Sequence, residues 1–283
     1  MQPTTLLNRL TRLVAPRRPP AVPAGPAPLA VPPPEPPPAV RAVLAAAGEP
    51  ARDYLRRAHA AGHPVAALER FAGQLRDLPA AALRRRLRLV DPARPGPVRL
   101  PGGPGQPAVP LAQIDGTTCG PMTVLVARAV VDPVYAWWLT GAGDAAAVAA
   151  RIAAEQRRIH DRANRFWPRR LGITPWGMVA VLRRELPATR YRWWLVDDTD
   201  PDRVRAALDR AAVAVAAGLP VPMLVGAQVP RHWVLLLARD PDGGQLRCYN
   251  PAGRVVRVDP AEVGTDRLAG LGFPHLQAVV VPW

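Results

Sequence analysis

The uneven distribution of proline is the feature that most limits how this chain can fold. The chain has 37 prolines among 283 residues, and thirteen of them fall in the first 38 positions. Proline fixes φ and lacks a backbone N–H, so a dense run of it excludes both helix and sheet ladder. Residues 1–38 are therefore predicted to form a Pro-rich, disordered leader with a polyproline-type linker. A docking segment for a partner is the alternative interpretation.

Beyond the leader, single prolines divide a helical pattern into short pieces. Residues 39–92 carry apolar side chains at helical spacing, with Arg and Glu between them. We expect a helical appendage that serves as a pro-region, a regulatory cap or a structural element. Residues 93–108 are predicted to be a Pro/Gly linker. The appendage should contain three or four helices, with breaks at Glu49-Pro50, Gly62-His63-Pro64 and Leu78-Pro79.

Residues 109–283 follow another pattern, in which helices come first and strands later. Helices followed by an antiparallel sheet describe an α+β domain. VPMLVGA and HWVLLLA are apolar on both faces, which places these two strands in the middle of a covered sheet. Helices are predicted from Cys119 to before Asp132, at 133–140, at 144–163, from Thr174-Pro175 and at 200–217. Strands are predicted at YRWWLV, VPMLVGA, HWVLLLA, QLRCYN, RVVRV and LQAVVV.

The charge pattern argues against a nucleic-acid-binding protein. The formal net charge is +15, and every basic residue is Arg. These Arg residues lie throughout the chain beside Asp and Glu, which is typical of solvated helix faces and not of one basic patch. His59 and His63 have a metal-ligand spacing, but Gly62 and Pro64 interrupt any helix there. We therefore expect no metal and no cofactor.

No apolar run reaches the length of a signal peptide or a transmembrane helix. The expectation is a cytoplasmic protein without a membrane span. Export by a route that needs no cleaved signal is the alternative.

Cys119 is the candidate nucleophile. It lies in the segment Q-I-D-G-T-T-C-G-P-M, where Thr118 is a plausible N-cap and Pro121 a plausible first-turn residue. The positive end of a helix favours a thiolate, which is the nucleophilic form of cysteine. A small buried cysteine that packs a helix start is the alternative interpretation.

His232 and Asn250 are the candidate partners of this thiol. His232 begins the strand HWVLLLA, and Asn250 ends the next strand, so an antiparallel hairpin brings both to one end of the sheet. His232 has the chemistry of a general base, and the Asn250 oxygen has that of the group that orients the ring. Taken singly, the same residues suit a strand cap and a turn.

Gln113, six residues before Cys119, is the candidate oxyanion donor, together with the Cys119 backbone N–H. Cys248 precedes Asn250 by two positions and so shares its face of the strand. A buried packing residue is one interpretation of Cys248, and reversible oxidation with Cys119 is the other. Six tryptophans, at 137, 138, 176, 193, 194 and 233, are expected mostly in the core.

The order Gln, Cys at a helix start, His on a strand and Asn on the next strand resembles the papain-like cysteine peptidases. Within them, residues 110–260 are similar to the peptidases that remove double-glycine leaders from bacteriocins. The similarity includes Gln-x5-Cys-Gly-Pro, the strands PVPMLV and HWVLLL, and the opening Gly172-Ile173-Thr174-Pro175. Those peptidases usually have Asp-Pro where this chain has Asn250-Pro251, and papain uses Asn.

The resemblance implies a papain-like catalytic domain over 109–283, with Cys119, His232, Asn250 and Gln113 as its site. The expected activity is hydrolysis of a peptide or isopeptide bond through an acyl-thioester on Cys119, in a peptide or protein substrate. A transglutaminase-like acyl transferase with the same site is a second hypothesis. A catalytically inactive papain-like module, which binds partners through the leader or the appendage, is a third.

Overall fold

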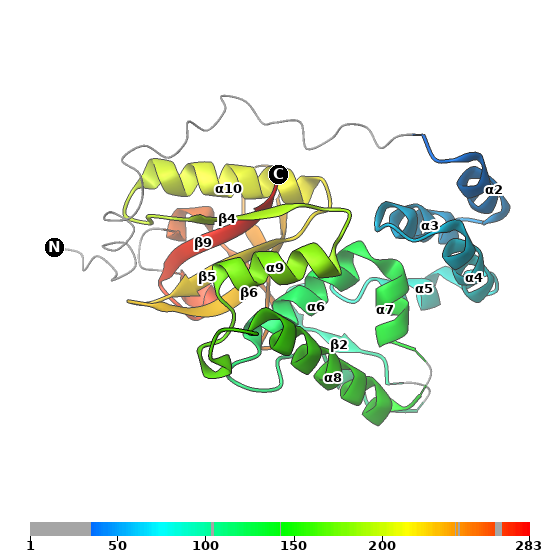
Figure 1. Cartoon of the computed structure of the whole chain (residues 1–283), viewed down its shortest axis with the longest axis horizontal. Coiled ribbons are helices and arrows are strands. Elements are labelled where there is room, and N and C mark those ends of the chain that lie inside the picture. Colours follow the sequence, from blue (N-terminus) through cyan, green and yellow to red (C-terminus); the bar gives the residue numbers. More distant parts are fainter. Residues whose placement is uncertain (1–34, 103–104, 142, 241, 243, 264–267) are drawn as a thin grey trace.

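A computed structural model describes residues 35–102, 105–141, 143–240, 242, 244–263 and 268–283. Figure 1 shows a twisted sheet with helices on both sides and a separate group of helices beyond one edge of this body. All of the predicted leader except its last four residues lies outside the described part of the chain. The architecture is α+β with an antiparallel sheet, as the order of helices and strands predicted.

Seven strands form the main sheet in the order β1-β8-β7-β6-β5-β9-β4. Every neighbouring pair is antiparallel. The two strands predicted to be central, β5 and β6, lie inside the sheet. The bounds are β1 (Gly96–Pro97), β4 (Tyr191–Leu195), β5 (Val221–Gly226), β6 (Pro230–Arg239), β7 (Leu246–Asn250), β8 (Arg254–Val258) and β9 (His275–Pro282).

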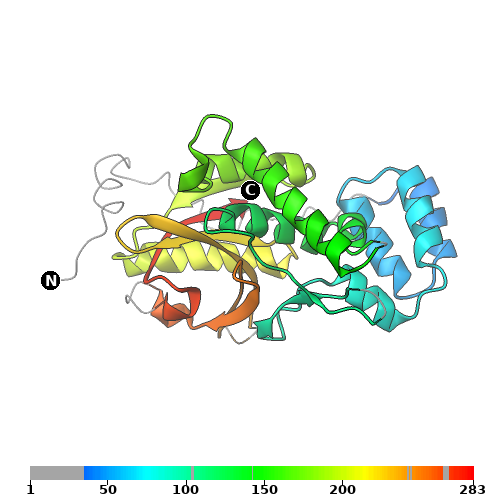
Figure 2. The ribbon, with the colours of Figure 1, turned by 90° about the horizontal axis from the view of Figure 1, so that it is seen from below.

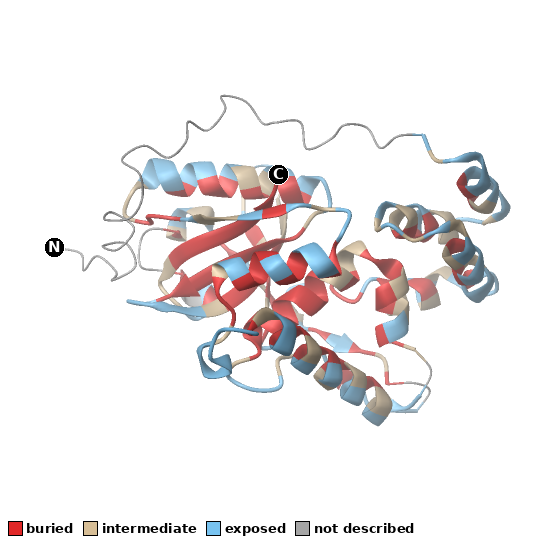
Figure 3. Ribbon diagram, viewed as in Figure 1, coloured by how far each residue is buried: buried red, intermediate tan, exposed pale blue. Residues whose placement is uncertain are grey.

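Helices cover both faces of this sheet, which explains why its central strands are apolar on both sides. Trp233 and Leu235 of β6 pack into the core layer beneath α6 (Cys119–Val131), α8 (Ala145–Ala163) and α9 (Pro175–Glu185). Val234 and Leu236 pack into the layer beneath α10 (Pro201–Ala216). Figure 3 shows the continuous buried band along these strands. None of the described helices is long and apolar enough to cross a membrane.

The helical appendage contains the four helices that its proline breaks predicted. They are α2 (Pro38–Ala46), α3 (Ala51–Ala60), α4 (Val65–Leu75) and α5 (Ala80–Leu87). They enclose a core of their own around Leu55 and Leu68, both 0% exposed. Figures 1 and 2 show this group beside α7 (Pro133–Leu139), at the far side of the body from α10.

Polar contacts join the appendage to the turn between α6 and α7. The Arg57 guanidinium donates to the Val130 carbonyl, and Arg86 stacks over the Trp137 ring at 3.4 Å. His63 Nε2 lies 2.9 Å from Asp132 Oδ1. All of these contacts lie at or beyond the C-terminal end of α6. At 1.5 Å per residue this is about 18 Å from Cys119 along the helix.

The segment predicted as a Pro/Gly linker is partly built into the fold. Gly96–Pro97 pairs with β8 as the edge strand β1. Next, β2 (Arg99–Leu100) pairs with β3 (Val109–Pro110) in a second, two-stranded sheet. Leu100 is 1% exposed. The buried side chains of Val98 and Leu100 anchor this segment. The linker prediction followed the surrounding prolines and was only partly correct, because these two apolar residues are buried.

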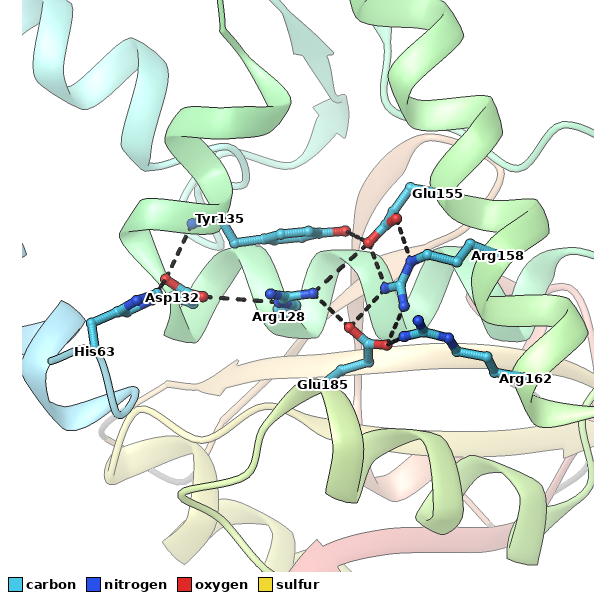
Figure 4. Close-up of polar contacts among 8 residues, drawn as sticks. All are labelled: His63, Arg128, Asp132, Tyr135, Glu155, Arg158, Arg162 and Glu185. Carbon is cyan, nitrogen blue, oxygen red and sulfur yellow. Dashed lines mark hydrogen bonds and ion pairs between the residues drawn. The ribbon is translucent and has the colours of Figure 1, made fainter. Parts of the chain in front are cut away.

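A buried ion network fixes the helices of the α6 layer to one another (Figure 4). Glu185 of α9 accepts hydrogen bonds from Arg128 of α6 at 2.6 Å and from Arg158 of α8 at 2.8 Å. Arg158 also binds Glu155, which accepts from the Tyr135 hydroxyl at 2.8 Å. These bonds satisfy carboxylates that would otherwise be costly to bury.

The network predicts an acid-sensitive contribution to stability from Glu185. Burial by itself raises the pKa of Glu185, but hydrogen bonds and charge from Arg158, with the charges of Arg128 and Arg162, lower it below its ordinary value. A carboxyl group with a lowered folded-state pKa stabilises the protein above its unfolded pKa, about 4.3. That stability is lost as the pH falls through the folded pKa.

We therefore expect Glu185→Gln to reduce the free energy of unfolding by about 3–5 kcal/mol at neutral pH. The deficit should shrink as the pH is lowered from about 5 towards 2. Urea titrations across this pH range measure it, with the exposed Glu69→Gln as the matched control. A deficit that is the same at every pH would contradict the assignment.

Candidate active site

Cys119 is the first residue of α6, as the sequence predicted, and it is 4% exposed. Thr118 holds the N-cap position, but its side chain makes no capping hydrogen bond. Its hydroxyl instead accepts from the backbone N–H groups of Ile114 and Asp115, each at 3.2 Å. The backbone N–H groups of Cys119 and Gly120 each lower the pKa of the Cys119 thiol.

Strand β6 meets the start of α6 at Trp233, the residue after His232. The backbone of Trp233 lies close enough to the Cys119 thiol to lower its pKa, and the Thr123 hydroxyl donates to the Trp233 carbonyl at 3.4 Å. The Trp233 indole N–H donates to the carbonyl of Ile173 at 2.7 Å. One buried residue thus joins the start of α6, the central strand β6 and the segment that opens α9.

The pKa of the Cys119 thiol is raised, whereas the sequence predicted a site that favours the thiolate. Burial raises the pKa of the thiol, and the hydrogen bonds from Trp233, Gly120 and Cys119 itself lower it only in part. The nearby Asp115 carboxylate raises it further. The prediction that the helix start favours a thiolate was therefore wrong for the resting protein: a thiol buried this deeply loses more hydration than a few N–H groups replace.

His232 and Asn250 come together as predicted. His232 Nε2 lies 3.0 Å from Asn250 Oδ1. Burial lowers the pKa of His232, and the hydrogen bond to Asn250 raises it in part, so the net pKa lies below its ordinary value. The ring also packs against Phe273, with 5.7 Å between the ring centroids. His232 is therefore neutral at pH 7, which is the state that a general base needs.

A second hydrogen bond fixes the tautomer of His232. Asn250 Oδ1 also accepts from the backbone N–H of Ala252 at 3.0 Å, so this end of the side-chain amide is the oxygen. An oxygen can only accept, so His232 Nε2 carries the proton and Nδ1 carries the lone pair. The turn after β7 thus sets which ring nitrogen can take a proton.

The structure does not join the sulfur and the ring directly. Among the described residues, no hydrogen bond links Cys119 to His232. The link between them is the backbone: His232 precedes Trp233, whose main chain contacts the sulfur. Side chains alternate along β6, and the Trp233 side chain lies in the same core layer as Cys119, whereas the His232 ring packs against Phe273 of the other layer. The thiol and the imidazole therefore lie near the same end of β6 but on opposite faces of the sheet.

Gln113 lies beside the end of β7. Its backbone N–H donates to the carbonyl of Pro251 at 2.8 Å, directly after Asn250. Its side-chain Nε2 donates to the carbonyl of Asp115 at 2.9 Å, and its Oε1 is buried without a partner. A primary amide has a second N–H, so one donor of Gln113 stays available at the loop that leads to Cys119.

Cys248 lies in the other core layer. It packs with the α10 side of the sheet and is 0% exposed, whereas Cys119 belongs to the α6 side. Burial raises the pKa of Cys248 to about 12. This placement supports the interpretation of Cys248 as a packing residue and speaks against a redox pair with Cys119.

Exposed apolar side chains lie on the segment next to Cys119. The Ile173 side chain packs on Gly120, where a Cβ would meet it at 3.0 Å. On either side of Ile173 in the sequence, Leu171 is 59% and Trp176 56% exposed. Of the six tryptophans expected mostly in the core, only Trp233 is fully buried. Trp176 is therefore free to contact a ligand, and it stacks edge-on with Trp167 at 6.0 Å.

A sizeable cavity lies elsewhere, in the appendage. It measures about 620 Å³ and is lined mainly by Ala, Val and Leu of α2, α4 and α5. Its lining contains neither a cysteine nor a histidine, and it does not include any of the four candidate site residues. The candidate reactive side chains therefore lie at the start of α6 and not in this cavity.

Sequence reasoning missed two residues that organise this site. One is Trp233, whose main chain contacts the thiol; its position next to His232 was the only available signal. The other is Gln156 of α8, which is fully buried and binds the backbone on both sides of Gln113. A polar residue on the apolar face of a predicted helix was the signal that could have identified it.

No protein-family model matches this chain, and no curated protein sequence matches it. The functional argument therefore depends on the geometry of the site itself.

The Asn250 contact predicts opposite responses of His232 to two substitutions. Asn250→Asp places a carboxylate at the ring and should raise the pKa of His232. Asn250→Ala removes the acceptor and should lower it further, because burial then acts without opposition. Titration of the ring C–H signals by NMR measures both pKa changes. Equal pKa values of His232 in both variants would contradict the contact.

Proposed function

We propose that this protein is a papain-like cysteine hydrolase that cleaves a peptide or isopeptide bond through an acyl-thioester on Cys119. The observation that carries the proposal is the contact between His232 and Asn250 at 3.0 Å. On β6, His232 is followed by Trp233, whose backbone lies beside the Cys119 thiol. A buried thiol, a base with a defined tautomer and an orienting amide therefore occur together at one end of the sheet. Packing alone requires none of these polar contacts.

The resting site supports a general-base mechanism that begins from neutral groups. The pKa of Cys119 is raised and that of His232 is lowered, so thiol and imidazole are both uncharged at neutral pH. As the sulfur attacks the substrate carbonyl, its proton passes to His232 Nδ1. The resulting imidazolium keeps its Nε2–H on Asn250. The ring and the thiol must first approach each other, because no hydrogen bond joins them at rest, and we assign this rearrangement to substrate binding.

The remaining steps use the same groups. The tetrahedral oxyanion is stabilised by the Cys119 backbone N–H and by the second N–H of the Gln113 amide. His232 returns its proton to the leaving amine, and the acyl group stays on the sulfur. Water, deprotonated by His232, then attacks the thioester and releases the acid and the free thiol.

The appendage leaves this site open. Its polar contacts to the body lie at Val130, Asp132, Trp137 and Thr140, at or beyond the C-terminal end of α6. An inhibitory pro-region would have to lie over the start of α6 instead. Among the three roles considered for residues 39–92, the geometry favours a structural element.

The acyl-enzyme separates the proposed hydrolase from its two rivals. p-Nitrophenyl acetate acylates an activated thiol and releases a coloured nitrophenolate, without a need for specific substrate recognition. We expect an initial burst, with the acetyl group on Cys119 by peptide mapping, followed by slow turnover as water cleaves the thioester. Cys119→Ala should abolish the burst, and His232→Ala should slow it by about 10²–10⁴-fold.

Other outcomes are equally informative. If an added amine captures the acetyl group much faster than water does, the protein is an acyl transferase. If wild type and Cys119→Ala release nitrophenolate at the same rate, the catalytic proposal is wrong and the fold serves binding alone. The chain contains no Lys, so side-chain amines add no background acylation.

A further inference from the structure

Gln156 holds the backbone on both sides of Gln113. It lies on α8, 43 positions further along the chain, and is 0% exposed. Its Oε1 accepts from the Ile114 N–H at 3.1 Å, and its Nε2 donates to the Ala112 carbonyl at 3.0 Å. In extended backbone these two groups, one residue on each side of Gln113, point the same way. The Gln156 amide thus pairs with the segment as a neighbouring strand would.

The opposite side of this segment is bound by the turn after β7. The Gln113 N–H donates to Pro251, and the buried Tyr249 hydroxyl donates to the Leu111 carbonyl at 2.6 Å. Gly253, at φ +88°, allows this approach, because a Cβ there would meet Ala112 Cβ at 3.0 Å. Pro251 follows Asn250, so the turn that orients His232 also binds Gln113.

We propose that Gln156 is a positioning residue for the oxyanion site: it sets the place of Gln113 relative to Cys119 and so controls acyl transfer. This inference rests on the proposed function. A donor stabilises an oxyanion only when it is held close to the position where the charge develops, and misplacement by about 1 Å can cost about 10²-fold in rate. Gln113 lies in a loop without regular structure, so its placement must come from neighbours such as Gln156.

The role requires an amide. The segment presents one donor and one acceptor to α8, and a Gln side chain supplies the complement of both. Leu at 156 would leave the Ala112 carbonyl and the Ile114 N–H without this partner. Glu would still accept from Ile114 but would place an oxygen against the Ala112 carbonyl. Both substitutions should therefore displace Gln113, whereas they leave the thiol, His232 and Asn250 in place.

Two reactions of the same thiol separate positioning from general structural damage. With p-nitrophenyl acetate, the Cys119 sulfur bonds to the acetyl carbon, an oxyanion forms and collapses, nitrophenolate leaves, and the thiol proton passes to His232. With iodoacetamide, the sulfur displaces iodide at a methylene carbon, and no oxyanion forms. The ratio of the acylation rate to the alkylation rate of Cys119 therefore reports the oxyanion site, and any loss of folded protein cancels.

We expect this ratio to fall about 10- to 100-fold in Gln156→Leu and in Gln156→Glu of the full-length protein. It should fall by a similar or larger factor in Gln113→Ala. The double variant Gln113→Ala/Gln156→Leu should fall no further than Gln113→Ala alone, because the two residues act on one donor. Val148→Ala, a buried packing change two turns earlier on α8, is the matched control and should leave the ratio unchanged.

The outcomes distinguish this inference from the proposed function. If wild-type Cys119 acylates no faster than it does in His232→Ala, both fail. If wild type acylates rapidly but the ratio is unchanged in the Gln156 variants, only the positioning role is wrong. Parallel loss of both rates, with a constant ratio, also overturns it, because Gln156 then supports the whole site and not the oxyanion donor.

Discussion

The contact between the start of α6 and strand β6 is the constraint on which the rest of this structure depends. Trp233 makes it twice, through its backbone beside the Cys119 thiol and through its carbonyl to Thr123, and its indole also binds Ile173 before α9. Ten of the thirteen residues of α6 are buried, so the helix has almost no freedom to shift. Once Trp233 is fixed, main-chain connectivity places His232 one residue from the part of β6 that lies beside Cys119.

Two supports then complete the arrangement from outside this contact. The turn after β7 orients the His232 ring through Asn250 and binds Gln113 through Pro251. The α8 layer binds the Gln113 segment through Gln156, and the ion network around Glu185 ties α8 to α6 and α9. Nearly all of these bonds are buried or partly buried, where an unmade hydrogen bond is costly. The polar contacts therefore specify one geometry of the site, and the apolar core supplies most of the stability.

Much of this fold follows from local sequence signals. The proline breaks predicted the helices of the appendage. The start of α9 at Thr174-Pro175 was also predictable, because an N-cap and a first-turn proline act locally. The pairing of His232 with Asn250 was predictable because one hairpin connects them. The sequence marks Gln156 only as a polar residue on an apolar helix face and could not reveal its partners, which lie more than forty positions away. It also could not reveal the raised pKa of Cys119, which comes from the burial of the helix start. The linker prediction for 93–108 was only partly correct, since tertiary burial of Leu100 outweighed the local prolines.

The central claim is that His232 activates Cys119, and the pH dependence of Cys119 alkylation by iodoacetamide tests it most directly. If neutral His232 takes the thiol proton, the wild-type rate should rise with pH through the lowered pKa of His232, below about 6.5, and then level off. In His232→Ala the rate should be far lower at pH 7 and should keep rising towards the raised pKa of the thiol. Coincident pH profiles for wild type and His232→Ala would contradict the account, because the thiol would then ionise without any help from the imidazole.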